Sequence, residues 1–229
     1  MTPLLLLPGM MCDHRLFSPL SEANAGQRDC VVADLSQHER WSDMAADVLA
    51  KAPPVFDLVG VSMGGALALE LCALAPDRVR RTVILDANPH ADTPEKRQGR
   101  LDLLEHLEND GLKALMEQRL LPNYLAPGKE NADLLALFWS MAEGLGEAVF
   151  KRQSHALLSR TSRLPDLANF NKPVLILRGA EDQICPRSYH TDLRDALPDA
   201  RFEEIEAAGH LPGLEAPEAT TKLIQDWLQ

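Results

Sequence analysis

The chain has 229 residues, of which 45% are hydrophobic and 25% are charged, as expected for a folded domain with room for an inserted subdomain. Its formal net charge of −11 argues against binding to nucleic acid or to an anionic membrane surface. The apolar run from Leu4 to Leu7 is too short for a signal peptide or a membrane span, so we expect a cytoplasmic protein.

Short apolar runs alternate with helix-forming stretches in the first part of the chain. The runs are rich in Leu, Val and Ile and end near Gly, Pro or Asp, which is typical of buried strands. Strands are therefore predicted at 4–7, 30–35, 55–61 and 82–86. Helices are predicted near 16–22, at 43–51 with Ser42 as the N-cap, and between Ser62 and Pro76.

The pattern changes at about residue 91, and no strand-like run follows until Pro173. Helical segments are predicted instead near 94–107, 112–120, 131–141 and 147–158, with Gly and Pro residues between them. A long helical insertion between two strands is typical of a segment that carries function. We therefore divide the chain into an α/β core of residues 1–90 and 171–229 and a helical cap of residues 91–170.

Alternation returns after the insertion, with strands predicted at 174–177 and 201–205 and helices at 186–197 and 216–228. Strands that alternate with helices pair in parallel through right-handed crossovers. The predicted fold class is thus α/β. We expect a doubly wound, mostly parallel sheet of six strands with helices on both faces.

The segment Gly60-Val61-Ser62-Met63-Gly64 joins the third predicted strand to the helix that follows it. Glycines on both sides of a serine permit a tight turn that lifts the hydroxyl group out of the sheet. The free N–H groups at the start of the helix favour negative charge there. The pattern predicts that Ser62 is a nucleophile, although Gly-x-Ser-x-Gly also occurs by chance.

A serine nucleophile needs a base, and a histidine base needs a carboxylate on its other ring nitrogen. His210 follows the sixth predicted strand and Asp182 follows the fifth. Both residues should meet Ser62, because the carboxyl ends of parallel strands share one edge of the sheet. Asp86, at the end of the fourth strand, is a second candidate for the acid.

Backbone N–H groups are the expected donors for the oxyanion that forms in acyl transfer. Met63 offers one N–H because it follows Ser62 at the start of a helix. The second is expected in the loop after the first strand, at Met10, with Met11 as the next choice.

Four segments together resemble the α/β-hydrolase family over nearly the whole chain. They are Leu7-Pro8-Gly9-Met10, the Ser62 turn, Gly179-Ala180-Glu181-Asp182 and Ala208-Gly209-His210-Leu211-Pro212, in the family's order of Ser, Asp and His. The resemblance is to small, capped, carboxylesterase-like members and implies the triad Ser62, Asp182 and His210. One departure is Pro8-Gly9 in place of the usual His-Gly, which keeps the backbone donor but removes a side chain.

The expected activity is that of a serine hydrolase that cleaves a small or medium carboxylic ester through an acyl-enzyme. The same triad serves carbon–carbon bond hydrolases and cofactor-free perhydrolases, which are the alternatives. A further alternative is a non-catalytic ligand-binding protein with this fold. The predicted partner is a small ester or acyl substrate, and the chain is expected to act as a monomer or a small homo-oligomer.

Candidate pocket residues lie near the predicted strand ends and in the insertion. Met11, His90 and Leu211 lie beside the predicted strand ends, and Phe138, Trp139 and Met141 form an apolar stripe in the insertion. His90 could equally anchor its loop. The stripe could equally serve helix packing within the cap.

No metal or cofactor is expected. The cysteines Cys12, Cys30, Cys72 and Cys185 are scattered and show no Cys-x-x-Cys spacing, so they are expected to be reduced thiols. The seven histidines form no cluster with the spacing of metal ligands.

Overall fold

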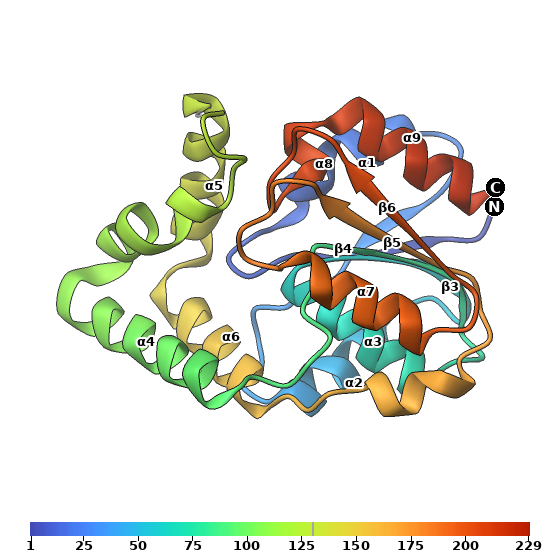
Figure 1. The fold of residues 1–229 in the computed structure, drawn as a ribbon, viewed down its shortest axis with the longest axis horizontal. Coiled ribbons are helices and arrows are strands. Elements are labelled where there is room, and N and C mark those ends of the chain that lie inside the picture. The colour runs from blue at the N-terminus through green and yellow to red at the C-terminus, as the bar shows by residue number, and fades with distance from the viewer. Residues whose placement is uncertain (130) are drawn as a thin grey trace.

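A parallel sheet of six strands organises the computed structural model, which describes residues 1–129 and 131–229 (Figure 1). The strand order is β2-β1-β3-β4-β5-β6, and every neighbouring pair is parallel. The predicted fold class is therefore confirmed. The strands are β1 (Leu4–Leu7), β2 (Cys30–Val32), β3 (Phe56–Val61), β4 (Val79–Leu85), β5 (Val174–Gly179) and β6 (Ala200–Ile205).

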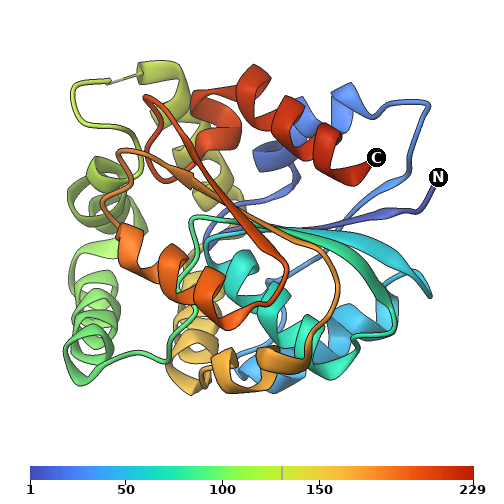
Figure 2. The same cartoon turned by 45° about the vertical axis from the view of Figure 1, so that its right-hand side comes forward.

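Helices cover both faces of the sheet (Figures 1 and 2). Helices α1 (Ser18–Ala23), α8 (Pro212–Glu215) and α9 (Pro217–Leu228) lie on one face, and a 3-10 turn, η1 (His14–Phe17), precedes α1. Helices α2 (Trp41–Lys51), α3 (Met63–Leu74) and α7 (Arg187–Ala196) lie on the other face. Within the described residues, no helix combines the length and the apolar character needed to cross a lipid bilayer.

The alternating side chains of the strands feed two hydrophobic clusters, one on each face of the sheet. In β1, for example, Leu4 and Leu6 join the cluster on the side of α1 and α9, whereas Leu5 and Leu7 join the cluster around α3. Helix α3 is buried along nearly its whole length, which explains its almost uniformly apolar sequence.

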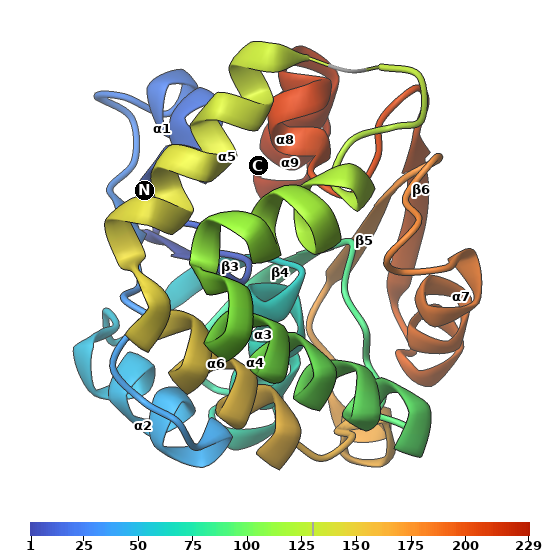
Figure 3. The same cartoon turned by 90° about the vertical axis from the view of Figure 1, so that its left-hand side faces the viewer.

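The predicted helical insertion lies between β4 and β5, as expected. In Figure 3 its helices stand in front of the carboxyl edge of the sheet, which is the edge where the candidate site residues lie. Its elements are α4 (Pro94–Leu115), interrupted at Gly111, the π-helix η2 (Met116–Leu120), the 3-10 turn η3 (Leu121–Asn123), α5 (Ala132–Leu145), α6 (Glu147–Ser159) and the 3-10 turn η4 (Leu164–Asn169).

Buried polar contacts connect this insertion to the α/β core. Gln153 on α6 accepts a hydrogen bond from the N–H of Met11 at 2.9 Å and donates one to the carbonyl of Leu35 at 3.2 Å. The last part of the insertion also packs into the core, since Leu157 and Leu167 join the cluster around α3.

Several predicted bounds differ from the structure, and two of the differences have a clear physical cause. Helix α2 begins at Trp41 with Arg40 as its N-cap, because the Trp41 N–H is bound by the Ser159 hydroxyl at 3.0 Å instead of by a local cap at Ser42. Strand β2 ends at Val32, and Asp34 then begins a turn by accepting the N–H of Ser36 at 2.9 Å.

Replacing Gly64 with alanine should destabilise the protein, because the added Cβ would collide with the backbone carbonyl of Leu7 at the end of β1. We expect a loss of about 1–3 kcal/mol or more in the free energy of unfolding, measured by urea denaturation. Gly99→Ala in α4 is the matched control, since a Cβ there meets open space, and it should stabilise the helix slightly. Equal effects of the two variants would contradict this account of the turn.

Candidate active site

Ser62 occupies a strained turn between β3 and α3. Its φ of 55° and ψ of −115° are unusual for a residue with a side chain, and such strain is concentrated at functional sites. The turn is possible because Gly60 and Gly64 lack side chains where the backbone of the turn and of Leu7 approaches closely. The turn leaves Ser62 half-buried at the carboxyl edge of the sheet.

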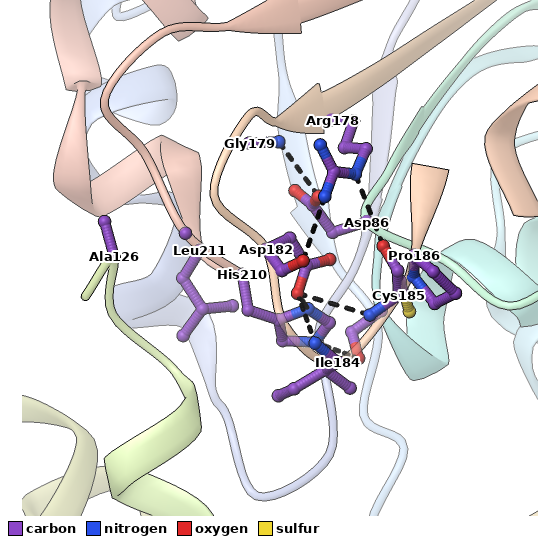
Figure 4. Close-up of polar contacts among 12 residues, drawn as sticks. Asp86, Ala126, Arg178, Gly179, Asp182, Ile184, Cys185, Pro186, His210 and Leu211 are labelled. Atoms are coloured by element: carbon purple, nitrogen blue, oxygen red, sulfur yellow. Dashed lines mark hydrogen bonds and ion pairs between the residues drawn. The ribbon is translucent and has the colours of Figure 1, made fainter. Parts of the chain in front are cut away.

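A continuous chain of hydrogen bonds links three of the predicted site residues. The Nε2 atom of His210 lies 2.8 Å from the Oγ of Ser62, and its Nδ1 atom lies 3.0 Å from Oδ1 of Asp182. Asp182 and His210 are both buried. Figure 4 shows the bond between them. The structure thus brings Ser62, His210 and Asp182 together from the loops after β3, β6 and β5.

The loop after β5 is built around the carboxylate of Asp182. Its Oδ1 also accepts the backbone N–H groups of Ile184 at 2.8 Å and Cys185 at 3.3 Å, while Arg178 donates to the Asp182 carbonyl at 2.9 Å (Figure 4). Burial alone would raise the pKa of Asp182, but the charge of His210 and the hydrogen bonds from His210 and the Ile184 N–H lower it below its ordinary value. Asp182 is therefore held as a carboxylate in a fixed orientation.

The loop that carries His210 is fixed by Glu215 on α8. Glu215 accepts the N–H groups of Gly209 at 3.0 Å and Leu211 at 3.2 Å with one oxygen, and that of Ala126 at 2.8 Å with the other. The N–H of His210 itself donates to the carbonyl of Tyr124 at 2.9 Å. The inserted segment therefore helps to hold the imidazole ring in place.

The predicted oxyanion donors lie at the entrance to α3 and in the loop after β1. Met63 is the first residue of α3, and neither its N–H nor that of Met10 donates a hydrogen bond to another described residue. Gly9 packs against Ser62, since a Cβ added there would lie 3.5 Å from the Ser62 Cβ. The N–H of Met11, the next choice, is already bound to Gln153.

Asp86, the alternative acid, follows β4 and does not reach His210. It is fully buried, and its Oδ1 accepts the N–H of Gly179 at 2.9 Å. Burial, followed by the nearby carboxylate of Asp182, raises the pKa of Asp86 well above its ordinary value.

A cavity of about 390 Å³ opens above Ser62 and His210, between the sheet edge and the insertion. Met10 and Met63 line it as well. Its further lining residues, none of them predicted, are Ala66, Asn88, Lys96, Arg100, Leu103, Arg119, Leu120, Asn123, Tyr124, Leu157, Arg160, Gln183, Ile184 and Cys185.

Four of the predicted pocket residues serve the core instead of this cavity. Met11, Phe138, Met141 and Leu211 are all buried in the hydrophobic cluster on the α1 and α9 side of the sheet. Phe138 packs edge-on against the ring of Tyr124, which does line the cavity. Phe138 and Met141 therefore serve helix packing, which was the alternative interpretation of the apolar stripe.

The other two predicted pocket residues also lie away from the cavity. His90 bonds to Asp192 at 3.0 Å and meets the edge of the Tyr189 ring, so it connects the loop after β4 to α7. Trp139 lines a separate hollow of about 560 Å³ formed within the insertion. In the part of the chain that the structure describes, neither residue lines the cavity at Ser62.

The sequence of α4 does contain a pattern that could have indicated part of the cavity wall. Lys96, Arg100 and Leu103 are spaced at i, i+4 and i+7, which puts them on one helical face. All three line the cavity. The spacing alone could not show that this face is turned toward Ser62.

Asp182, Cys185 and His210 are the described residues whose side chains converge as metal ligands would, with ligand atoms within 4.8 Å of one another. Burial, followed by the charge of Asp182, raises the pKa of the Cys185 thiol well above its ordinary value. A neutral thiol is a weak metal ligand, because zinc binds the thiolate. The other two groups, Asp182 and His210, are already hydrogen-bonded to each other.

Comparison with known proteins agrees with this geometry. Residues 4–223 match the Alpha/beta hydrolase family. The pimeloyl-[acyl-carrier protein] methyl ester esterase of Nitrosomonas europaea is 30% identical over 203 residues, which cover 85% of this chain and 77% of that protein. BpoC of Mycobacterium tuberculosis, described as a non-heme bromoperoxidase, is 30% identical over 234 residues, covering 95% of this chain and 82% of that protein.

Solved structures show the same fold. A thermophilic esterase from Thermogutta terrifontis has a TM-score of 0.89 to this chain at 22% sequence identity, with 100% of this chain and 89% of that chain covered. The predicted family is confirmed by the match over most of the sequence. The chain belongs to the alpha/beta hydrolase family.

Proposed function

We propose that this protein is a serine hydrolase that cleaves carboxylic esters through an acyl-enzyme. The observation that carries the proposal is the hydrogen-bond chain from Ser62 through His210 to Asp182, with distances of 2.8 Å and 3.0 Å. The match to a methyl ester esterase at 30% identity supports an ester as the bond that is cleaved.

The proposed reaction begins when Ser62 Oγ attacks the ester carbonyl carbon and its proton passes to Nε2 of His210. Asp182 accepts a hydrogen bond from Nδ1, which keeps Nε2 free as a base and stabilises the imidazolium. The N–H groups of Met63 and Met10 are the proposed donors to the oxyanion.

Collapse of the tetrahedral intermediate breaks the carbon–oxygen bond, and His210 returns its proton to the departing alcohol. Water then gives a proton to His210 and attacks the acyl group on Ser62. The second collapse releases the carboxylic acid and restores the Ser62 hydroxyl group.

Perhydrolysis is a second candidate, favoured by the similarity to the bromoperoxidase BpoC over 95% of this chain. In that reaction hydrogen peroxide replaces water in the attack on the acyl-enzyme and releases a peracid. Peracid formation from acetate and peroxide, measured beside ester hydrolysis, distinguishes a specialised perhydrolase from an esterase.

Replacing Ser62 with alanine should lower kcat on a short 4-nitrophenyl ester by a factor on the order of 10⁴ or more, because the attacking oxygen is removed. A fluorophosphonate probe should label the wild type and not the variant. Ser188→Ala, an exposed serine on α7, is the control and should leave both readouts unchanged. Substantial ester turnover by Ser62→Ala would refute the nucleophile.

The change Asp182→Asn should lower kcat by roughly 10³- to 10⁴-fold, because an amide at this position favours the wrong imidazole tautomer. The folded state should persist, as checked by circular dichroism. Asp192→Asn on the surface of α7 is the matched control and should keep normal activity. An active Asp182→Asn enzyme would instead make another carboxylate the partner of His210.

A further inference from the structure

The cavity above Ser62 has a cationic wall, although the whole chain is acidic. Lys96, Arg100, Arg119 and Arg160 line it, and no Asp or Glu is found among its described lining residues. The chain as a whole carries a net charge of −11. A local excess of positive charge in a cleft of an acidic protein attracts anions toward it.

Two of these cations are already engaged by the structure. Arg100 and Arg160 both pair with the buried carboxylate of Asp92, Arg160 at 3.2 Å. Arg160 also donates to the carbonyl of Asn88 at 2.8 Å, and its side chain is only 3% exposed. This cluster fixes the start of α4 against the loop after β4 and keeps a net positive charge at the wall.

Lys96 and Arg119 remain available for a ligand. The Lys96 ammonium lies 4.6 Å from the centre of the Tyr189 ring, and neither cation pairs with a carboxylate within the described residues. Lys96 comes from α4 and Arg119 from η2, and both contribute to the wall of the cavity that Ser62 enters from the sheet.

We infer that the substrate carries an anionic group, apart from the bond that is cleaved, and that Lys96 and Arg119 bind it. The inference rests on the proposed function, because it assumes that Ser62 is the reacting group of this cavity. Either the acyl or the alcohol part of the substrate can carry this anion, and the test has one arm for each.

The acyl arm compares 4-nitrophenyl half-esters of glutarate, adipate and suberate with the neutral terminal amides of the same chains. The alcohol arm compares 4-acetoxybenzoate with 4-acetoxybenzamide. In at least one arm the wild-type kcat/KM should favour the charged substrate by about 10-fold or more, as charge-assisted hydrogen bonds to an anion do. High salt should reduce this preference.

Lys96→Gln and Arg119→Gln should each lower the charged-to-neutral ratio several-fold, and the double variant should bring it near one. Any loss of activity on the neutral amide should be smaller than the loss on the charged substrate. Lys113→Gln is the matched control, because Lys113 lies on α4 but does not line the cavity.

A ratio near one in both arms for the wild type would overturn the inference, as would equal loss on charged and neutral substrates in the variants. Failure of the proposed function is a different result. In that case neither member of a pair is hydrolysed, and Ser62 is not labelled by the fluorophosphonate probe.

A second inference concerns the unused carboxyl group of Asp86. Asp86 lies beside Asp182 in Figure 4, and its φ of 46° is strained like that of Ser62. The Oδ2 atoms of Asp86 and Asp182 are both buried, and neither has a donor among the described residues. Asp86 follows β4 and Asp182 follows β5, the neighbouring parallel strand, so the two buried carboxyl groups lie at the same edge of the sheet.

Two carboxylates cannot hydrogen-bond, because neither has a hydrogen to donate. One proton on the pair removes the conflict and satisfies both buried oxygens. Asp182 is the member held as a carboxylate, since it accepts bonds from His210, Ile184 and Cys185. The proton therefore belongs to Asp86, whose Oδ1 remains free to accept the Gly179 N–H.

We propose that Asp86 is a positioning residue that stays protonated and donates its hydrogen to Oδ2 of Asp182. This bond leaves Oδ1 of Asp182 directed at His210. Burial and the charge of Asp182, which raise the pKa of Asp86, agree with this assignment. The other charged or titratable groups around the pair are Arg178 on β5, Cys185, His190 on α7 and His210.

Asp86→Asn tests the proposal because an amide can donate to Asp182 and accept from Gly179 in the same way. It should keep kcat within about three-fold of the wild type and leave the acidic limb of the pH–rate profile in place. Asp86→Ala should lower kcat by about 10- to 100-fold with little change in KM. The infrared carbonyl band of a protonated carboxylic acid should be present in the wild type and lost in Asp86→Asn.

An ionised Asp86 predicts the opposite outcome. Its negative charge would stabilise the imidazolium of His210, so Asp86→Asn would then move the acidic limb to lower pH. That shift, or the absence of the infrared band in the wild type, would overturn the proposal even if Asp86→Ala failed to fold.

Discussion

Close approach between backbone segments at the carboxyl edge of the sheet is the constraint on which this site depends. Gly64 lets the start of α3 pack directly against the last carbonyl of β1. Gly179 does the same for the end of β5 and the loop that carries His210. Since these contacts involve backbone on both sides, neither can yield by a side-chain movement. Three loops are thereby fixed near Ser62 before any polar interaction contributes.

Electrostatics then divides this edge into two environments. Beneath Ser62, the buried Asp182 and Asp86 lie side by side, which is stable only when the pair carries less than two full charges. Above Ser62, the wall supplied by the insertion is positive. A reacting ester would thus lie between a shielded negative site that serves the imidazole and an exposed positive wall that faces the rest of the substrate.

The parallel sheet, the loops that carry the site residues and the meeting of Ser62, Asp182 and His210 could be predicted from the sequence. Each depends on a local pattern, such as glycines around a serine or an apolar run that ends at an acid, combined with the rule that parallel strands share an edge. The cavity wall was not accessible in this way. Phe138 was expected in the pocket because it belongs to an apolar stripe of the insertion, whereas nothing in the sequence singled out Lys96.

The difference lies in the packing of the insertion, whose helices could turn several faces toward the sheet. Its helices are amphipathic, but their orientation is decided by distant contacts, such as the bond of Ser159 to the Trp41 N–H. The same long-range contact displaced the start of α2 from the position predicted by a local N-cap. Sequence patterns therefore predict where helices and strands lie better than they predict which face of a helix is turned toward the sheet.

Gln153 and Glu215 each connect the insertion to the core by hydrogen bonds, since Gln153 binds the loop after β1 and Glu215 binds both Ala126 and the His210 loop. This connection matters for protein engineering. A cap transplanted from another hydrolase would remove the acceptor of the Met11 N–H and one partner of Glu215, even if every triad residue were retained. Recombination at this boundary therefore has to transfer these contacts along with the helices, or it will disturb the catalytic loops while changing the pocket.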